Sequence, residues 1–338
     1  MRGVAGALCA AALLASPGAR ERRSSARAQD AAGGGAATVA VTLSAVDKEG
    51  RPFEGLRPED LRVTADGAGQ KVLSLARRAD EPLRVVVMLD ASASQERILP
   101  AARREAAEFL AALLRAGRDD AAVVSFTDVA SVVEGPTDDL GALRRAAQSV
   151  RFFPPPGYVA GGVIVGPPPR GPALPGSTAL WDSLASVCDK LFAGAKGGAG
   201  RRMIVLVTDG VDTSSRAGDD RAVERLLRAG VAVYSVGLGD GERFDGVERG
   251  ALRKLSERTG GRALFPRNEG GLPEAFARVR GEALSTYVLR FAPEGLKPGG
   301  GRARRLRVEV VNPELRRLGV ALAYPQSLFD PAPPAASR

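Results

Sequence analysis

The residues best suited to do chemistry lie in the stretch RVVVMLDASASQ, residues 84–95. A run of apolar, mostly β-branched residues stops on Asp90, and two hydroxyl side chains follow at alternate positions, Ser92 and Ser94. Carboxylate and hydroxyl oxygens suit hard divalent cations such as Mg²⁺, Mn²⁺ and Ca²⁺, and they do not suit Zn²⁺. The spacing therefore indicates a metal-binding loop at the end of a buried strand.

Two other segments offer the same kind of group. Asp209 follows an apolar run in VLVTDGVD, and Thr178 lies in a Gly-Ser-Thr turn just before an expected helix. Ligands of an open parallel sheet bind beyond the C-terminal ends of its strands, so we expect these oxygens to converge on one edge. With two carboxylates and three hydroxyls, the ion would keep enough positive charge to accept an anionic oxygen from a partner.

Strands and helices alternate in the region that must position these groups. The expected strands are 85–89, 122–126, 129–133, 203–207, 231–236 and 263–265, and the expected helices are 99–116, 140–150, 180–191, 221–228, 252–258 and 274–284. This alternation predicts an α/β fold: a doubly wound, mostly parallel sheet of the Rossmann-like type, covered on both faces.

Shorter runs with a period of two flank this region, at residues 38–82 and 284–326. Sheets of two or three strands are marginally stable alone, and the termini of an α/β domain often lie close together. We therefore expect the two flanking segments to pair into one small β-sandwich, with the α/β domain at 83–283 inserted between them. The tail, 327–338, is expected to be disordered.

The N-terminus has the pattern of an export signal. Arg2 precedes a short apolar run, and small residues before Ala19 and Ala28 offer two cleavage positions, which predicts a signal peptide over 1–28. A flexible linker follows at 29–37, and no other stretch is long and apolar enough to span a membrane. We expect an exported protein that is periplasmic, secreted or at the cell surface.

Residues 154–176 break the α/β pattern, because they contain eight Pro and six Gly in 23 positions. They read as an inserted loop, and such loops are either functional or disordered. Since the loop leads directly into Thr178, one interpretation places it at the metal edge as a contact for partners. The alternative interpretation, which the sequence favours equally, is a disordered surface loop with no role in binding.

Together these residues resemble a von Willebrand factor type A (VWFA) domain over about 83–283. DASAS is similar to the D-x-S-x-S motif of that family, with Asp90, Ser92 and Ser94 in place, GSTALWDS supplies Thr178 and TDGVD supplies Asp209. The segments VVSFTD, VYSVGLGD and LRKLSERTGGRALFP are also similar to sequences of that family. The flanking segments resemble exported bacterial VWFA-related proteins. The resemblance implies a metal-ion-dependent adhesion site (MIDAS) that binds Mg²⁺ (or Mn²⁺ or Ca²⁺) and an Asp or Glu of a partner protein.

Other classes of protein fit the sequence less well. The chain has no His, which excludes Ser-His and Cys-His catalysis, and it has neither a G-x-S-x-G elbow nor a phosphate-binding P-loop. Its net charge of +9 comes from Arg residues spread among acidic ones, which favours a solvated surface over a nucleic-acid groove. We therefore expect a binding module with no catalytic residues, and the alternative is an envelope scaffold that uses the fold without a metal.

Overall fold

The structure is a computed structural model that describes residues 38–78, 80–154, 158–159, 163–164, 177–192, 200–239, 246–295 and 302–329. All of these residues belong to one compact unit, 36–338. The predicted signal peptide and linker lie outside the described residues. So does most of the predicted 154–176 insertion, of which two short paired strands are described, β8 (Tyr158–Val159) and β9 (Val163–Ile164).

A six-stranded sheet in the order β12-β11-β10-β5-β6-β7 forms the centre of the α/β region. Its strands are β5 (Leu83–Asp90), β6 (Asp120–Phe126), β7 (Ala130–Thr137), β10 (Arg201–Thr208), β11 (Val231–Gly237) and β12 (Ala263–Leu264). All neighbouring pairs are parallel except β6 and β7, which are joined by a short turn and are antiparallel. The prediction of a mostly parallel sheet is confirmed.

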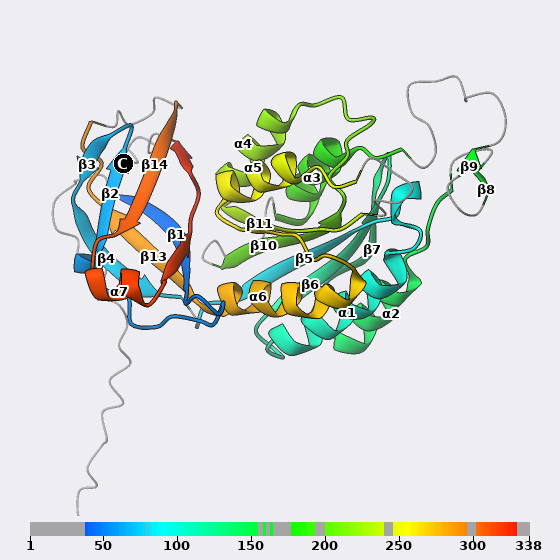
Figure 1. Ribbon diagram of the computed structural model, residues 1–338, viewed down its shortest axis with the longest axis horizontal. Helices are drawn as coiled ribbons and strands as arrows, with labels where there is room; N and C mark the ends of the chain where they lie inside the picture. Colours follow the sequence, from blue (N-terminus) through cyan, green and yellow to red (C-terminus); the bar gives the residue numbers. More distant parts are fainter. Residues whose placement is uncertain are drawn as a thin grey trace, which may run out of the picture. The chain divides into compact units, whose positions relative to one another are not determined.

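Helices cover both faces of this sheet (Figure 1). On one face lie α1 (Leu99–Leu113), α2 (Leu140–Ser149) and α6 (Leu272–Leu284), and on the other lie α3 (Leu180–Val187), α4 (Asp219–Arg228) and α5 (Arg249–Thr259). Alternate residues of β5 enter the two apolar cores, because successive side chains of a strand point to opposite faces: Val85 and Val87 lie in one core, and Val86 and Met88 in the other. The continuous apolar run therefore marks a strand that is buried on both faces.

Two small antiparallel sheets form an additional β domain. Their orders are β15-β1-β13-β4 and β16-β14-β2-β3. Their strands are β1 (Val39–Val46), β2 (Leu61–Ala65), β3 (Ala68–Gln70), β4 (Val72–Arg77), β13 (Thr286–Phe291), β14 (Ala303–Val310), β15 (Ala321–Ala323) and β16 (Ser327–Phe329). Each sheet combines strands from both ends of the chain, and both bury side chains in one shared core.

The chain therefore enters and leaves the α/β region from neighbouring strands. β4 is the last strand before this region and β13 is the first strand after it, and the two pair with Leu75 opposite Leu289. Residues 327–329 correct the expected start of the disordered tail: β16 pairs with β14 and buries Leu328 in the core of the β domain. Residues 330–338 lie outside the described residues.

Short helices complete the described elements. They are the α-helix α7 (Pro313–Arg317), the 3-10 helices η1 (Pro58–Asp60), η2 (Ala93–Gln95) and η4 (Glu269–Gly271), and the π-helical turn η3 (Cys188–Phe192). Within the part of the chain that the structure describes, no helix is long and apolar enough to cross a membrane.

Candidate metal centre

The two aspartates of the predicted site lie at the C-terminal ends of adjacent strands. In the parallel pairing of β10 with β5, Val207 is opposite Leu89, so Asp90 ends one strand where Thr208 ends the other, and Asp209 is the next residue. The sheet extends from β5 through β6 in one direction and through β10 in the other. The aspartates therefore flank the topological switch point, where ligands of doubly wound sheets bind.

The loop after β5 folds around the Asp90 carboxylate. Asp90 Oδ1 accepts a hydrogen bond from the amide of Ser92 at 2.9 Å, and the hydroxyls of Ser92 and Ser94 lie 3.2 Å apart. The second oxygen, Asp90 Oδ2, accepts a hydrogen bond from the Thr208 hydroxyl at 2.5 Å. These bonds hold Asp90 and both serine hydroxyls of the predicted site together.

Asp209 is held from the loop after β5 and from its own turn. Its Oδ1 accepts a bond from the Val211 amide at 3.0 Å, and its Oδ2 accepts one from Gln95 Nε2 at 3.1 Å. The Ser94 hydroxyl lowers the pKa of this carboxyl in part, which indicates that the two groups lie near each other. Gly210 permits the turn, because its φ is +83° and a Cβ there would lie 2.7 Å from Cγ of Leu252.

Backbone hydrogen bonds of Thr178 and of the next residue place Thr178 at the same edge of the sheet. The amide of Ala179 donates to the carbonyl of Thr127, which follows β6, at 2.7 Å. The Thr178 amide and carbonyl both bond Thr213, four residues after Asp209. The side chain is buried, and no described contact joins its hydroxyl to the other four residues of the predicted set. The structure therefore links Asp90, Ser92 and Ser94 by hydrogen bonds, places Asp209 close enough for its charge to act on Asp90, and brings the Thr178 backbone to the loop after Asp209.

The two carboxylates are buried next to each other. Asp90 is 2% exposed and Asp209 is 1% exposed. Burial, and then the negative charge of Asp209, raise the pKa of Asp90 to about 7, although hydrogen bonds from Ser92 and Thr208 lower it in part. Burial also raises the pKa of Asp209. At neutral pH the pair carries negative charge that its protein surroundings do not neutralise.

The donor set fits a divalent cation. In the described residues, the groups that hydrogen-bond the two carboxylates are neutral: backbone amides, the Thr208 hydroxyl and the Gln95 amide. The hydroxyls of Ser92 and Ser94, which lower the pKa of the pair, are neutral as well. Buried charges are stable in proteins when they are paired or when they coordinate a metal. No group of three or more His, Cys, Asp or Glu side chains suited to a metal occurs among the described residues, so any ion here would need hydroxyl ligands as well.

Two residues of this centre are not among the predicted ones. Thr208 donates a hydrogen bond to Asp90 and Gln95 donates one to Asp209. Both side chains are buried, with at most 1% of their surface exposed. Gln95 directly follows the serine loop, so its position was a signal that could have found it. Thr208 could be placed only by the register of β10 against β5, which is a long-range pairing.

Two acidic residues at this edge have other roles. Asp212 accepts hydrogen bonds from the amide of Leu180 at 2.8 Å and from the Ser215 hydroxyl at 2.6 Å, and it thereby holds the first turn of α3. Asp128 accepts a bond from the neighbouring Thr127 hydroxyl at 2.9 Å. These contacts stabilise local backbone turns, as Asp side chains commonly do.

Comparison with known proteins finds similarity at the level of folds. No protein-family model and no curated protein matches the sequence. Proximal thread matrix protein 1 from the mussel byssus is similar, with 15% identity over 64% of this chain and 49% of that chain and a TM-score of 0.49. A von Willebrand factor type A protein from Catenulispora acidiphila has 16% identity over 88% of this chain and 73% of that chain, with a TM-score of 0.46.

A third similar structure is BatB, a conserved hypothetical protein from Bacteroides thetaiotaomicron, with 16% identity over 60% of this chain and 98% of that chain and a TM-score of 0.43. The chain spans about half the length of the mussel protein. Another structure of the mussel protein is described as having a zinc-occupied MIDAS motif. All three TM-scores are below 0.5.

Proposed function

We propose that this chain is a divalent-cation-dependent protein-binding module of the adhesion type. One observation carries the proposal: Asp90 and Asp209, at the ends of adjacent strands, are buried next to each other beside the hydroxyls of Ser92 and Ser94, and the groups that donate to them are neutral. Mg²⁺ fits such a set of oxygen ligands, and Mn²⁺ or Ca²⁺ can replace it.

In this proposal each side chain has a defined task. Ser92, Ser94 and Thr178 supply hydroxyl oxygens to one ion, while Asp90 and Asp209 bind it directly or through water and orient the serines. Gln95 and Thr208 hydrogen-bond the carboxylates and hold their orientation, as residues outside the ligand set commonly do. The ion, when bound, supplies positive charge at the sheet edge, where an Asp or Glu side chain of a partner protein completes the site.

The site is proposed to bind without catalysing a reaction. The chain has no His, and the oxygens of both carboxylates accept hydrogen bonds from amide and hydroxyl groups. Among the described contacts, the partners of the two carboxylates are amide and hydroxyl groups, and none of these is a general acid or base near neutral pH. The residues thus offer a charged anchor for a carboxylate and no proton relay.

The setting of the module is part of the proposal. We propose a VWFA domain at 83–283 and a β domain formed by 38–82 and 284–326, in an exported protein of the cell envelope or exterior. The 154–176 insertion is proposed to lie at the metal edge and to influence the choice of partner. Deleting it should change which partner binds while Mg²⁺ affinity stays nearly the same.

Calorimetric titration with Mg²⁺ and Mn²⁺ tests the metal site. Wild-type protein should bind either ion saturably at millimolar concentration or below. Asp90→Ala should abolish the binding heat while circular dichroism shows a folded chain. Asp128→Ala is the matched control, because Asp128 lies near the same edge but bonds only its neighbour Thr127 in the described contacts. Equal ion affinity in wild type and Asp90→Ala would refute the assignment.

A second experiment tests partner binding. Immobilised protein should capture a partner from envelope extracts in Mg²⁺, lose it in EDTA and recover it when Mg²⁺ is restored. Capture that is the same with and without EDTA would instead support the scaffold alternative, in which the fold acts without a metal.

A further inference from the structure

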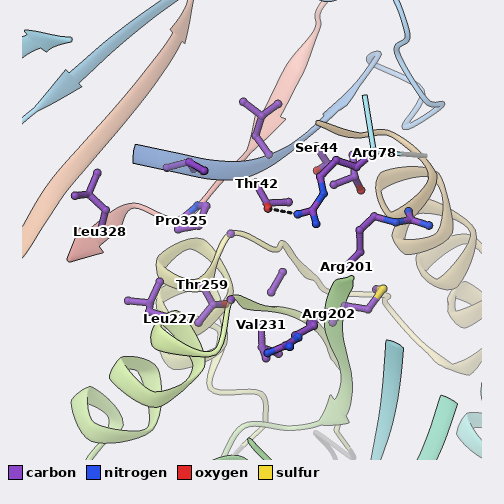
Figure 2. A pocket seen from close by; sticks show the side chains of 18 of the residues that line it. Thr42, Ser44, Arg78, Arg201, Arg202, Leu227, Val231, Thr259, Pro325 and Leu328 are labelled. Atoms are coloured by element: carbon purple, nitrogen blue, oxygen red, sulfur yellow. Dashed lines mark hydrogen bonds between the residues drawn. The ribbon is translucent and has the colours of Figure 1, made fainter. Parts of the chain in front are cut away.

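A cavity of about 580 Å³ lies at the N-terminal edge of the six-stranded sheet, between β1 of the β domain and the starts of β10 and β11 (Figure 2). Its volume is within the range of roughly 300–1,000 Å³ that is usual for small-molecule sites. Asp90 and Asp209 lie at the other end of β5 and β10, and an eight-residue strand spans roughly 25 Å. The cavity is therefore separate from the proposed metal centre.

The charged residues of the cavity wall are all basic. Arg78, Arg201, Arg202 and Arg228 line it, and no Asp or Glu is part of the lining. Two of these arginines already have carboxylate partners outside the wall, since Arg78 bonds Glu81 and Arg228 bonds Glu224. The other two, Arg201 and Arg202, bond backbone carbonyls. The cavity therefore has an excess of positive charge.

Arg201 is the most enclosed of the four, with 4% of its surface exposed. Its Nη1 donates to the carbonyl of Ala283 at 2.5 Å, and its Nε and Nη2 donate to the carbonyl of Glu81 at 3.3 and 3.2 Å. Burial and then the charge of Arg115 lower its pKa to about 10, so the guanidinium is still charged at neutral pH. Among the described residues no carboxylate forms an ion pair with Arg201, and the charges of Asp119 and Glu81 only partly offset the cost of burying the guanidinium.

Arg78 faces the cavity from the β-domain side. Figure 2 shows its guanidinium beside Thr42 of β1, and Nη1 donates to the Thr42 hydroxyl at 3.1 Å. The Nε of Arg78 is buried and has no hydrogen-bond partner among the described atoms. A buried donor without a partner costs free energy, and the oxygen of an anionic ligand could satisfy it.

Helix ends reduce this positive charge without cancelling it. The C-terminal ends of α4, α5 and α6 contribute to the wall through Gly230, Gly260 and Ala283. Each helix C-terminus acts as roughly half a negative charge, and three of them amount to less than the two full charges of Arg201 and Arg202. The cavity thus favours a ligand that carries at least one negative charge.

Apolar groups form the remainder of the wall. Leu227, Val231 and Leu328 line the cavity, from α4, β11 and β16. On β1, alternate residues point in opposite directions: Val39 and Val41 are buried in the β-domain core, while Ala40 is exposed on the other side. A ligand that fits this wall has an apolar part as well as its charge.

We propose that this cavity binds an organic anion whose carboxylate or phosphate head group is held by Arg201, Arg202 and Arg78, and whose short apolar chain lies against Leu227, Val231 and Leu328. Arginine suits both head groups, because its planar guanidinium can donate two parallel hydrogen bonds to either. The site lies where the β domain meets the α/β sheet, so its ligand would contact both.

Calorimetric titration of the full chain tests the ligand class. Octanoate and octyl phosphate are the probes, and we expect saturable binding of at least one, which identifies the preferred head group. Acetate and inorganic phosphate lack the chain, and octanol lacks the charge, so each should bind at least tenfold more weakly than the better probe. Absence of saturable binding by both amphiphiles up to millimolar concentration would overturn the proposal.

Variants locate the site. Ala40→Trp should fill the cavity from β1 without removing a described hydrogen bond, and it should weaken probe binding at least tenfold. Ala76→Trp is the matched control, since Ala76 is an exposed alanine on β4 of the same sheet and does not line the cavity. Arg202→Gln should also weaken binding, and each variant is checked by its melting temperature. Unchanged affinity in a folded Ala40→Trp variant would contradict the assignment.

The metal centre supplies an independent control. Asp90→Ala should leave octanoate or octyl phosphate binding unchanged, because the cavity shares no residue with the proposed metal ligands. Failure of the probe titration therefore rejects the anion site alone, and failure of the Mg²⁺ titration rejects the metal site alone.

Discussion

Asp90 combines two properties that are rarely found together in a stable protein. Its carboxylate is almost completely buried, and the nearest charged group is a second buried carboxylate, Asp209. Without a cation this arrangement is unfavourable, because both burial and like charge disfavour the ionised form. In the proposed metal site a bound divalent ion would recover this free energy, and metal affinity would then be coupled to stability.

The metal-free protein should for this reason lose stability as the pH rises. The pKa of folded Asp90 is about 7, above the value of 3.8 for an exposed carboxyl, so its contribution is most favourable at low pH and is lost as the pH passes through about 7. Asp90→Asn removes the charge, and in EDTA it should raise the melting temperature more at pH 8 than at pH 5, because the contribution is lost between pH 3.8 and about 7. Thermal melts of both proteins at the two pH values check this, and a variant that is less stable than wild type at pH 8 would contradict it.

Part of the candidate site could be predicted from a short local sequence pattern. Asp90, Ser92 and Ser94 are neighbours in sequence, and their alternation after a buried strand is itself the signal. Thr208 and Gln95 could not be assigned in the same way, because their contacts depend on the β5–β10 register and on the path of the loop. The roles of the five predicted ligands stay predictions until an ion is titrated.

At the scale of elements, one buried carboxylate joins the end of α1 to the start of β5. Asp119 accepts bonds from the Leu83 amide at 2.9 Å and from the Arg115 amide at 3.0 Å, and also from the Arg115 guanidinium at 2.7 and 2.8 Å. Burial alone would raise the pKa of Asp119, but the bonds from Arg115 and Leu83 outweigh it, and the pKa is lowered.

Asp119→Asn should therefore destabilise the protein, by roughly 3 kcal/mol, because it removes the buried carboxylate charge that faces the Arg115 guanidinium. The sign of the pH dependence is opposite to that of Asp90: the folded pKa of Asp119 is lowered, so its contribution is present above pH 4 and is lost in acid. Urea unfolding of wild type and variant at pH 7 and pH 3 measures both effects. A difference in stability that did not shrink in acid would argue against this account.

The types and order of the main elements could be predicted, while their ends and several short elements could not. The apolar runs at β5 and β10 and the amphipathic helices are local patterns. The strand β16 is three residues long, and it exists because Leu328 is buried against β14 and the core of the β domain. The π-helical turn after α3 likewise has no local signal in the sequence. Such elements follow from tertiary packing.

At the scale of the whole molecule, the β domain depends on both ends of the chain. Each of its sheets contains strands from before and after the α/β region. A chain that ends at Leu284 lacks β13 to β16, so residues 38–77 should become sensitive to protease. The proposed VWFA domain should stay folded and keep its Mg²⁺ affinity within about threefold, as expected of an independent domain. Limited proteolysis and calorimetry measure the two outcomes, and loss of Mg²⁺ binding would show that the proposed domains are not independent.

Metal binding should also be visible as a change in the stability of the entire chain. A ligand that binds only the folded state at a concentration 100 times its Kd stabilises that state by about 2.7 kcal/mol. For a chain of this size, this corresponds to a rise of several degrees in melting temperature. The rise should be larger at pH 8 than at pH 5, because protons compete with Mg²⁺ for Asp90. Asp209→Asn should abolish the rise and Asp128→Asn should retain it, and a rise of equal size in all three proteins would mean that Mg²⁺ acts elsewhere on the chain.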